Sequence, residues 1–268
     1  MRIELHCHST CSDGTEAPAQ VAARAAARGV EVFALTDHDT CAGWDVAVPG
    51  ARVLRAAEMS CDHKGRTIHV LAYDRGGNGW GALEEKLADI RVARINRMRV
   101  MVARLEQRGI HIDIAPLLVL SNERTIGRPD LARAMVAAGH VTSMKEAFSR
   151  HLFDGGPVDV PTRALSMADA LAAGRAANAA MSLAHPHLYD DLSITLLRDF
   201  KDLGLTGVEA YYGNYDARER HRWMQVADGR GLTCTGGSDW HGPDEGHGPV
   251  GVDLPPERAD AVQRWLGF

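Results

Sequence analysis

The sequence predicts an α/β protein whose strands are mostly parallel and covered by helices, and three observations support this. Short β-like runs alternate with alanine-rich helical stretches, the order typical of strand–helix–strand units. The chain of 268 residues is long enough for one large α/β barrel or two small domains. Its composition, with 45% hydrophobic and 24% charged residues, is that of an ordered globular protein.

Seven strands are expected, each a short run rich in apolar residues. They span residues 2–8, 31–36, 52–60, 66–73, 181–185, 207–211 and 232–237. Helices are expected at residues 17–28, 80–108, 167–177, 193–203 and 217–230. The first of these has the usual boundary residues, because Thr15 precedes it, Pro18 lies in its first turn and Gly29 ends it.

The middle of the chain departs from this alternation. After the long helix at 80–108, residues 110–157 favour helix and contain no strong strand, so we interpret this region as a helical insertion. The chain then divides into residues 1–98 and 158–268, which form the barrel, and an insertion at about 99–157. Five arginines of the long helix follow amphipathic spacing, and most of them are expected on a solvated face: Arg91, Arg94, Arg97, Arg99 and Arg104.

Charge and composition narrow the function classes. A formal net charge of -5 provides no overall basic field, so we expect small-molecule partners and no binding of duplex DNA. We expect no association with a membrane, because the apolar runs are shorter than a membrane span and the N-terminus does not resemble a signal peptide. Five cysteines without a CxxC pair indicate free thiols and a cytoplasmic location.

The first candidate ligands are His6 and His8. Residues two apart on a strand project from the same face, so the two imidazoles converge. Asp13 follows in a Ser-Asp-Gly turn that can direct its carboxylate back over the strand end. A pair of histidines at this spacing is by itself as often structural as functional.

A second cluster, Thr36-Asp37-His38-Asp39, follows the next apolar strand. Catalytic residues of α/β barrels lie at such strand ends. Helix capping is an alternative role for either aspartate. For His38 we expect a role as a ligand, because the flanking carboxylates can orient its ring.

Glu58 and His69 are linked by a predicted hairpin. A hairpin centred between His63 and Lys64 would place Glu58 directly opposite His69, with Cβ atoms about 5 Å apart, so that one metal ion binds both. The alternative is an exposed cross-strand ion pair. Glu58, however, lies in the apolar stretch 53–59, where an unpaired carboxylate is costly.

Further candidates follow the late strands. His185 ends one of them, while Asp239 and His241 follow the last, whose paired glycines allow close backbone approach. The complete set has nine members: His6, His8, Asp13, His38, Glu58, His69, His185, Asp239 and His241. Nitrogen and carboxylate donors without thiolate suit manganese, zinc, iron or, less readily, magnesium, and manganese is the metal we expect. Nine donors are enough for two or three ions, which together generate hydroxide at neutral pH.

The combination of HxHS, TDHD, a Glu and a His about ten residues apart, HPH and GSDxH resembles the polymerase and histidinol phosphatase (PHP) family. The resemblance implies a distorted seven-stranded TIM-like β/α barrel with a trinuclear metal site. It further implies a first site of His6, His8, Glu58 and Asp239, a second of Glu58, His69 and His185, and a third of Asp13, His38 and His241.

Within that family, the motif at residues 125–130, Thr-Ile-Gly-Arg-Pro-Asp, is similar to that of 3′,5′-nucleoside bisphosphate phosphatases and short-RNA 5′ exonucleases. That group commonly has His after the proline, where this chain has Asp130. Arg124 and Arg128 are candidates for phosphate binding, because guanidinium donors match phosphate oxygens, with a surface ion pair as the alternative for each. His187 and Asn214 are candidate substrate contacts, with turn formation and packing as their alternatives.

The expected activity is hydrolysis of the 3′-phosphate of nucleoside 3′,5′-bisphosphates by a hydroxide that bridges the metals. The second-ranked activity is 5′–3′ trimming of short single-stranded RNA. Hydrolysis of histidinol phosphate ranks third. A non-catalytic metal-bearing binding module is a further alternative, disfavoured because all nine ligand positions are filled.

Overall fold

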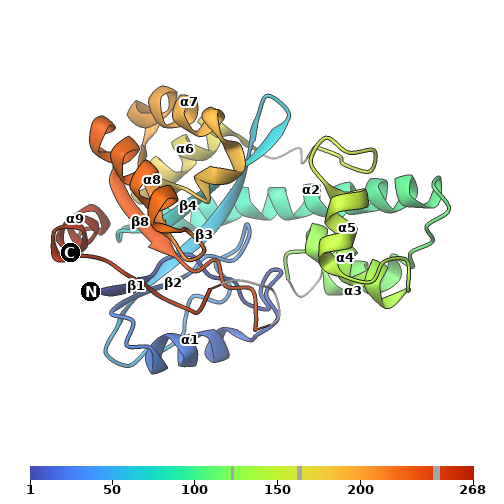
Figure 1. The fold of residues 1–268 in the computed structure, drawn as a ribbon, viewed down its shortest axis with the longest axis horizontal. Helices are drawn as coiled ribbons and strands as arrows, with labels where there is room; N and C mark the ends of the chain where they lie inside the picture. Colours follow the sequence, from blue (N-terminus) through green and yellow to red (C-terminus); the bar gives the residue numbers. More distant parts are fainter. Residues whose placement is uncertain (122–123, 162–164, 244–247) are drawn as a thin grey trace.

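The strands form one nearly closed, barrel-shaped sheet (Figure 1), seen in a computed structural model that describes residues 1–121, 124–161, 165–243 and 248–268. The strands are β1 (Arg2–Glu4), β2 (Val32–Leu35), β3 (Arg52–His63), β4 (Arg66–Asp74), β5 (Leu165–Ser166), β6 (Ala179–Leu183), β7 (Leu205–Tyr212), β8 (Thr233–Gly237) and β9 (Val252–Asp253). Their order is β8-β7-β6-β4-β3-β2-β1-β9, with β5 beside β3.

The sheet curves round until β1 meets β8. The amide of Leu5 donates to the carbonyl of Gly236 at 3.2 Å, and Cys7 forms a parallel bridge with Trp240. The pairs β1–β2, β2–β3, β6–β7 and β7–β8 are parallel, as predicted for strands joined through helices. The pairs β3–β4, β4–β6 and β1–β9 are antiparallel.

Helices cover the outside of this sheet and form a separate group at one end (Figure 1). They are α1 (Pro18–Ala27), α2 (Trp80–Glu106), α3 (Ala115–Leu120), α4 (Arg128–Ala137), α5 (Met144–Ala147), η1 (Phe148–Leu152), α6 (Met167–Ala176), η2 (Pro186–Tyr189), α7 (Asp191–Asp199), η3 (Lys201–Leu203), α8 (Ala217–Arg230) and α9 (Pro256–Leu266). The seven predicted strands and five predicted helices are all found. The prediction missed β5 and β9, which at two residues each are too short to show periodicity, and α9.

Helix α2 belongs to two hydrophobic cores. Its first half contributes to the barrel core the side chains of Trp80, Leu83, Leu87 and Ile90. Its second half joins the core of α3, α4 and α5 through Met98, Met101, Val102 and Leu105. The change from one core to the other supports our proposal that an insertion begins near residue 98.

The prediction of a solvated arginine face on α2 is wrong. Among the five arginines only Arg99 is exposed, whereas Arg94 is 7% exposed and pairs with Asp39 at 2.6 Å. Arg97 pairs with Asp159 at 2.9 Å. The spacing of apolar residues identified a polar side of α2, but it did not show that the barrel and the insertion loop cover that side.

The hairpin register also differs from the prediction. Lys64 and Gly65 both have positive φ, 53° and 81°, and form the two-residue turn, so His69 pairs with Ser60 rather than Glu58. This is a shift of two residues. Because an even shift keeps each side chain on its face of the sheet, Glu58 and His69 still meet diagonally.

No helix of the described residues is long and apolar enough to cross a membrane.

Candidate metal centre

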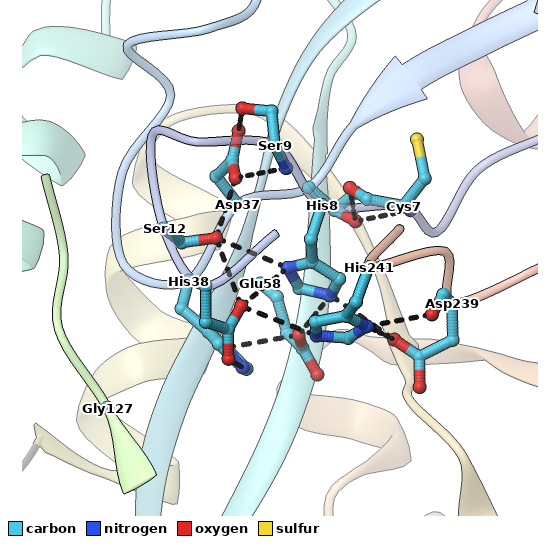
Figure 2. Close-up of polar contacts among 12 residues, drawn as sticks. Cys7, His8, Ser9, Ser12, Asp37, His38, Glu58, Gly127, Asp239 and His241 are labelled. Carbon is cyan, nitrogen blue, oxygen red and sulfur yellow. Dashed lines mark hydrogen bonds and ion pairs between the residues drawn. The ribbon is translucent and has the colours of Figure 1, made fainter. Parts of the chain in front are cut away.

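The nine predicted ligands converge at one end of the barrel. They come from strands β3 and β4 and from the segments that follow β1, β2, β6 and β8. Figure 2 shows five of them directed toward a common centre: His8, His38, Glu58, Asp239 and His241. Segments far apart in the sequence therefore supply one site.

The first group contains His6, His8, Glu58 and Asp239. The Nε2 atom of His6 lies 3.4 Å from Glu58 Oε2 and 3.2 Å from Asp239 Oδ1. The Nε2 atom of His8 lies 3.2 and 3.3 Å from the same two oxygens. Two ligands held about 2.1 Å from one ion in tetrahedral geometry lie roughly 3.4 Å apart, so this group has the spacing of a metal site.

The second group uses the other oxygen of Glu58. His69 Nδ1 and His185 Nε2 each lie 3.0 Å from Glu58 Oε1, and the two nitrogens are 3.2 Å apart. One carboxylate thus presents an oxygen to each of two ligand groups, which is the arrangement of a bridging ligand.

The third group is centred on Asp13. Its carboxylate oxygens lie 3.5 Å from His38 Nε2 and 3.3 Å from His241 Nε2. His38 also places its Nδ1 atom 3.1 Å from Glu58 Oε2, and His8 approaches Asp13 at 3.6 Å. The three groups are therefore continuous rather than separate.

The donor atoms fit bound divalent metal ions. The Nε2 atoms of His6 and His8, Nδ1 of His38 and Oε2 of Glu58 are buried and lack a hydrogen-bond partner. Buried polar atoms without partners are rare in native proteins, and these four face one another. Imidazole nitrogen with carboxylate oxygen is a donor set that suits manganese, zinc or iron.

Hydrogen bonds on the far side of the rings orient the histidines. His6 Nδ1 lies 2.9 Å from Glu209, and His241 Nδ1 lies 2.8 Å from the Asp239 carbonyl. An N–H donated at Nδ1 leaves Nε2 with its lone pair directed into the cluster. Glu209 also accepts from the amide of His185 at 2.6 Å. Sequence reasoning missed Glu209, although a single acidic residue within an apolar strand was a usable signal.

Glu4 is a second buried carboxylate that the sequence analysis missed. It accepts from the amides of His6, Ser238 and Gly251 at 3.1, 2.9 and 2.6 Å, and so joins β1 to the loop after β8. Burial raises the pKa of Glu4 to about 7. The contact needs glycine at Gly237, because a Cβ there would lie 2.3 Å from the His6 amide nitrogen.

Asp37 and Asp39 hold loops, so the helix-capping alternative is wrong for both. Asp37 accepts from the amide and hydroxyl of Ser9 and from the hydroxyl of Ser12, which fixes the loop that carries Asp13 (Figure 2). Asp39, with a φ of 53°, accepts from the amide of Ser60 at 2.7 Å.

The carboxylates of the cluster are held in their charged form. Burial alone would raise the pKa of Asp13, but the imidazoles of His38 and His241 hold it well below its usual range. Burial likewise opposes ionisation of Glu58 and Asp239, and neighbouring histidines lower both pKa values well below normal. The neighbouring histidines thus favour the ionised form of all three carboxylates.

Comparisons with known proteins give the family. A protein-family model of the PHP domain matches residues 4–73. The chain is 36% identical to a 3′,5′-nucleoside bisphosphate phosphatase of Chromobacterium violaceum, over 95% of this chain and 93% of that protein. The chain belongs to the PHP family. It is thus a phosphoesterase-type hydrolase, as the residue pattern predicted.

Other relatives of this PHP chain carry different names. It is 31% identical to a phosphoribosyl 1,2-cyclic phosphate 1,2-diphosphodiesterase of Eggerthella lenta, over 89% of this chain and 94% of that protein. It is 32% identical to a 5′-3′ exoribonuclease of Haemophilus influenzae, over 90% of each. A solved structure from Bifidobacterium adolescentis, described as a metal-dependent phosphoesterase, superimposes with a TM-score of 0.83 at 29% identity, covering 98% of this chain and 95% of that one.

A cavity of about 200 Å³ opens over the cluster of the PHP chain. Beyond the ligands it is lined by Thr67, Arg94, Arg97, Arg128, Pro129, Phe148, Asp154, Leu188 and Tyr189. Of the two arginines predicted to bind phosphate, Arg128 lines this cavity, where it pairs with the exposed Asp154. Sequence reasoning missed Arg94 and Arg97, which it had assigned to solvent.

The guanidinium groups of Arg94, Arg97 and Arg128, each paired with a carboxylate, all line this cavity and repel one another. Burial, together with the charges of Arg128 and Arg94, lowers the pKa of Arg97 to about 10. An anion placed beside them relieves this repulsion, and the fork of N–H donors matches a phosphate group.

The other predicted substrate contacts lie outside this cavity. Arg124 donates to the carboxylate of Asp130 and to the carbonyl of Ser12. His187 and Asn214 line a neighbouring cavity, in which His187 Nδ1 lies 2.9 Å from the hydroxyl of Tyr215. Contact of these three residues with substrate stays a prediction.

Proposed function

We propose that this PHP protein is a phosphomonoesterase that removes the 3′-phosphate of a nucleoside 3′,5′-bisphosphate and leaves the nucleoside 5′-monophosphate. The observation that carries the proposal is the wall formed by Arg94, Arg97 and Arg128 beside the nine-ligand cluster. Two anion-binding features side by side suit a substrate with two phosphate groups. The likeness to the Chromobacterium violaceum phosphatase supports the same substrate class.

The nine ligands would hold two or three divalent ions, and we propose manganese. Bound ions of this kind lower the pKa of water and neutralise the charge that develops on the phosphoryl oxygens. The chain itself contributes the ionised carboxylates of Asp13, Glu58 and Asp239 and the histidines oriented through their outer nitrogens.

The arginine wall would bind and orient the second phosphate. Arg94 is fixed in place, since its guanidinium donates to Asp39 and to the Ser60 hydroxyl at 2.6 Å each. Arg128 is less constrained, because its partner Asp154 is 66% exposed. The fixed Arg94 would position the substrate, and the less constrained side chain of Arg128 would let the substrate enter the cavity.

Trimming of short 5′-phosphorylated RNA is the second candidate function. A further cavity shares Thr67, Arg97 and Asp154 with the metal cavity and continues past Lys64 and Arg66 at the tip of the β3–β4 hairpin. It offers room and positive charge for further nucleotides. Histidinol phosphate carries one phosphate, so it leaves the arginine wall without a second anion.

Phosphate release by manganese-loaded protein separates these functions. The substrates are adenosine 3′,5′-bisphosphate, adenosine 5′-monophosphate, histidinol phosphate and a short 5′-phosphorylated RNA. We expect release from the bisphosphate and none from the monophosphate. A higher specificity constant for mononucleotide release from RNA would assign the exoribonuclease activity instead, and no hydrolysis of any of the four would refute both.

A further inference from the structure

Asp130 is the centre of a buried ion-pair group in the insertion. It lies in the first turn of α4, its side chain is 1% exposed, and it accepts from the amide of Gly127 at 2.8 Å. It also accepts from two guanidinium groups, that of Arg124 and that of Arg133, the latter at 3.2 Å. A single carboxylate therefore holds two arginines together.

Both arginines also donate hydrogen bonds to the loop that carries Asp13. Arg124 donates to the carbonyl of Ser12, and Arg133 donates to the carbonyl of Asp13 itself at 2.6 Å. A third link in the same place is the bond from the amide of Thr125 to the carbonyl of Cys11, at 3.0 Å. Three consecutive carbonyls of the loop, those of residues 11, 12 and 13, are thus bound by the insertion.

The position of Asp13 depends on these links. The loop has no helix or strand of its own, so its backbone is placed by Asp37 from one side and by the insertion from the other. Without the negative charge of Asp130, the guanidinium groups of Arg124 and Arg133 would repel each other. Their separation would release the carbonyl of Asp13.

We propose that Asp130 is a positioning residue of the metal centre. Through Arg124 and Arg133 it holds the Asp13 backbone so that the Asp13 carboxylate meets His38 and His241. The inference rests on the proposed function only in taking these residues as metal ligands. It makes the insertion a structural part of the third ligand group.

Manganese titration of the metal-free, full-length Asp130→Asn variant tests this. Calorimetry gives the stepwise dissociation constants, and no substrate is needed. We expect one step to be about 10- to 100-fold weaker than in the unmodified protein, with the other steps unchanged, because groups that orient a metal ligand have effects of this size. The matched control is Asp228→Asn on α8, which breaks a two-bond pair with Arg258 of α9 and should leave every step unchanged.

A double-variant comparison separates positioning from general stability. If Asp130 acts through Asp13, then Asp130→Asn causes no additional loss of affinity in an Asp13→Asn background. Arg133→Met provides a second route if Asp130→Asn does not fold, and it should weaken the same step. Unchanged manganese binding with only a lower melting temperature, or an equal weakening of all steps, would overturn the inference. Absence of phosphatase activity in the unmodified protein would refute the proposed function and leave this result standing.

Discussion

Glu58 has an unusual position among the residues of the cluster. Its Oε1 atom lies 3.0 Å from nitrogens of His69 and His185, and its Oε2 atom lies 3.1 to 3.4 Å from nitrogens of His6, His8 and His38. One carboxylate therefore serves five imidazoles. Glu58 belongs to the first two ligand groups and contacts the third through His38, so its charge acts on all three.

The substitution Glu58→Gln keeps the shape of the side chain and removes its charge. Because the amide cannot act as an anionic bridge, we expect the bound metal per chain to fall by at least one ion and turnover of a phosphoester to fall by about 100-fold or more. Elemental analysis of the purified variant measures the first and phosphate release the second. Full metal content in the variant would contradict the bridging role.

Arg128 allows the proposed second phosphate site to be tested apart from the metal-ligand cluster. The substitution Arg128→Ala removes a charged donor from the cavity wall, so we expect kcat/KM for adenosine 3′,5′-bisphosphate to fall about 10- to 100-fold. A substrate with a single phosphate, such as p-nitrophenyl phosphate, should be affected less than threefold. Arg128→Lys serves as the control that keeps the charge. Equal losses for both substrates would show that Arg128 does not read a second phosphate.

Among the elements, the β3–β4 hairpin sets the diagonal contact of Glu58 with His69. Its register depends on a turn in which Gly65 has a φ of 81° and faces open space. The substitution Gly65→Ala therefore introduces backbone strain without a steric clash. We expect the free energy of unfolding to fall by about 1 kcal/mol, as measured by urea denaturation. Lys64→Gly, which relieves a positive φ of 53°, should not lower the free energy of unfolding. A lower free energy of unfolding for Lys64→Gly than for Gly65→Ala would argue against this turn.

Short motifs predicted the site, whereas contacts between elements did not follow from sequence. His6 and His8 lie two residues apart, and both rings reach Glu58 and Asp239 as strand geometry predicted. Asp239 has a φ of 54°, so its approach to His241 does not come from extended backbone. The register of Glu58 was missed because the prediction centred the turn between His63 and Lys64, whereas Lys64 and Gly65 form it. Arg94 was missed because helical spacing identifies the polar side of α2 but does not reveal that Asp39 and Ser60 cover it.

Across the whole molecule, the metal centre joins distant parts of the chain. Its ligands extend from residue 6 to residue 241, and the buried carboxylates among them carry charge in the folded state. Ions that bind only the folded protein stabilise it in proportion to their affinity and concentration. We therefore expect stability to depend on metal content.

Removal of metal should therefore destabilise the protein. We expect treatment with a chelator to lower the melting temperature by several degrees, and added manganese to restore it in a concentration-dependent way. Differential scanning calorimetry measures both. Magnesium at the same concentration is the informative comparison, since the histidine-rich donor set favours manganese. An identical melting temperature with and without manganese would argue against binding at this cluster.

The seam at which the barrel closes has a consequence for synthesis of the protein. The amide of Asp239 donates to the carbonyl of His6 at 2.7 Å, next to the contacts of Leu5 with Gly236 and Cys7 with Trp240. Ligands from the first and last strands are thus brought together by the final closure. A nascent chain that has not yet emerged as far as residue 239 lacks two of the nine candidate ligands, Asp239 and His241. We therefore expect the proposed hydrolytic activity to begin only after residue 241 has emerged.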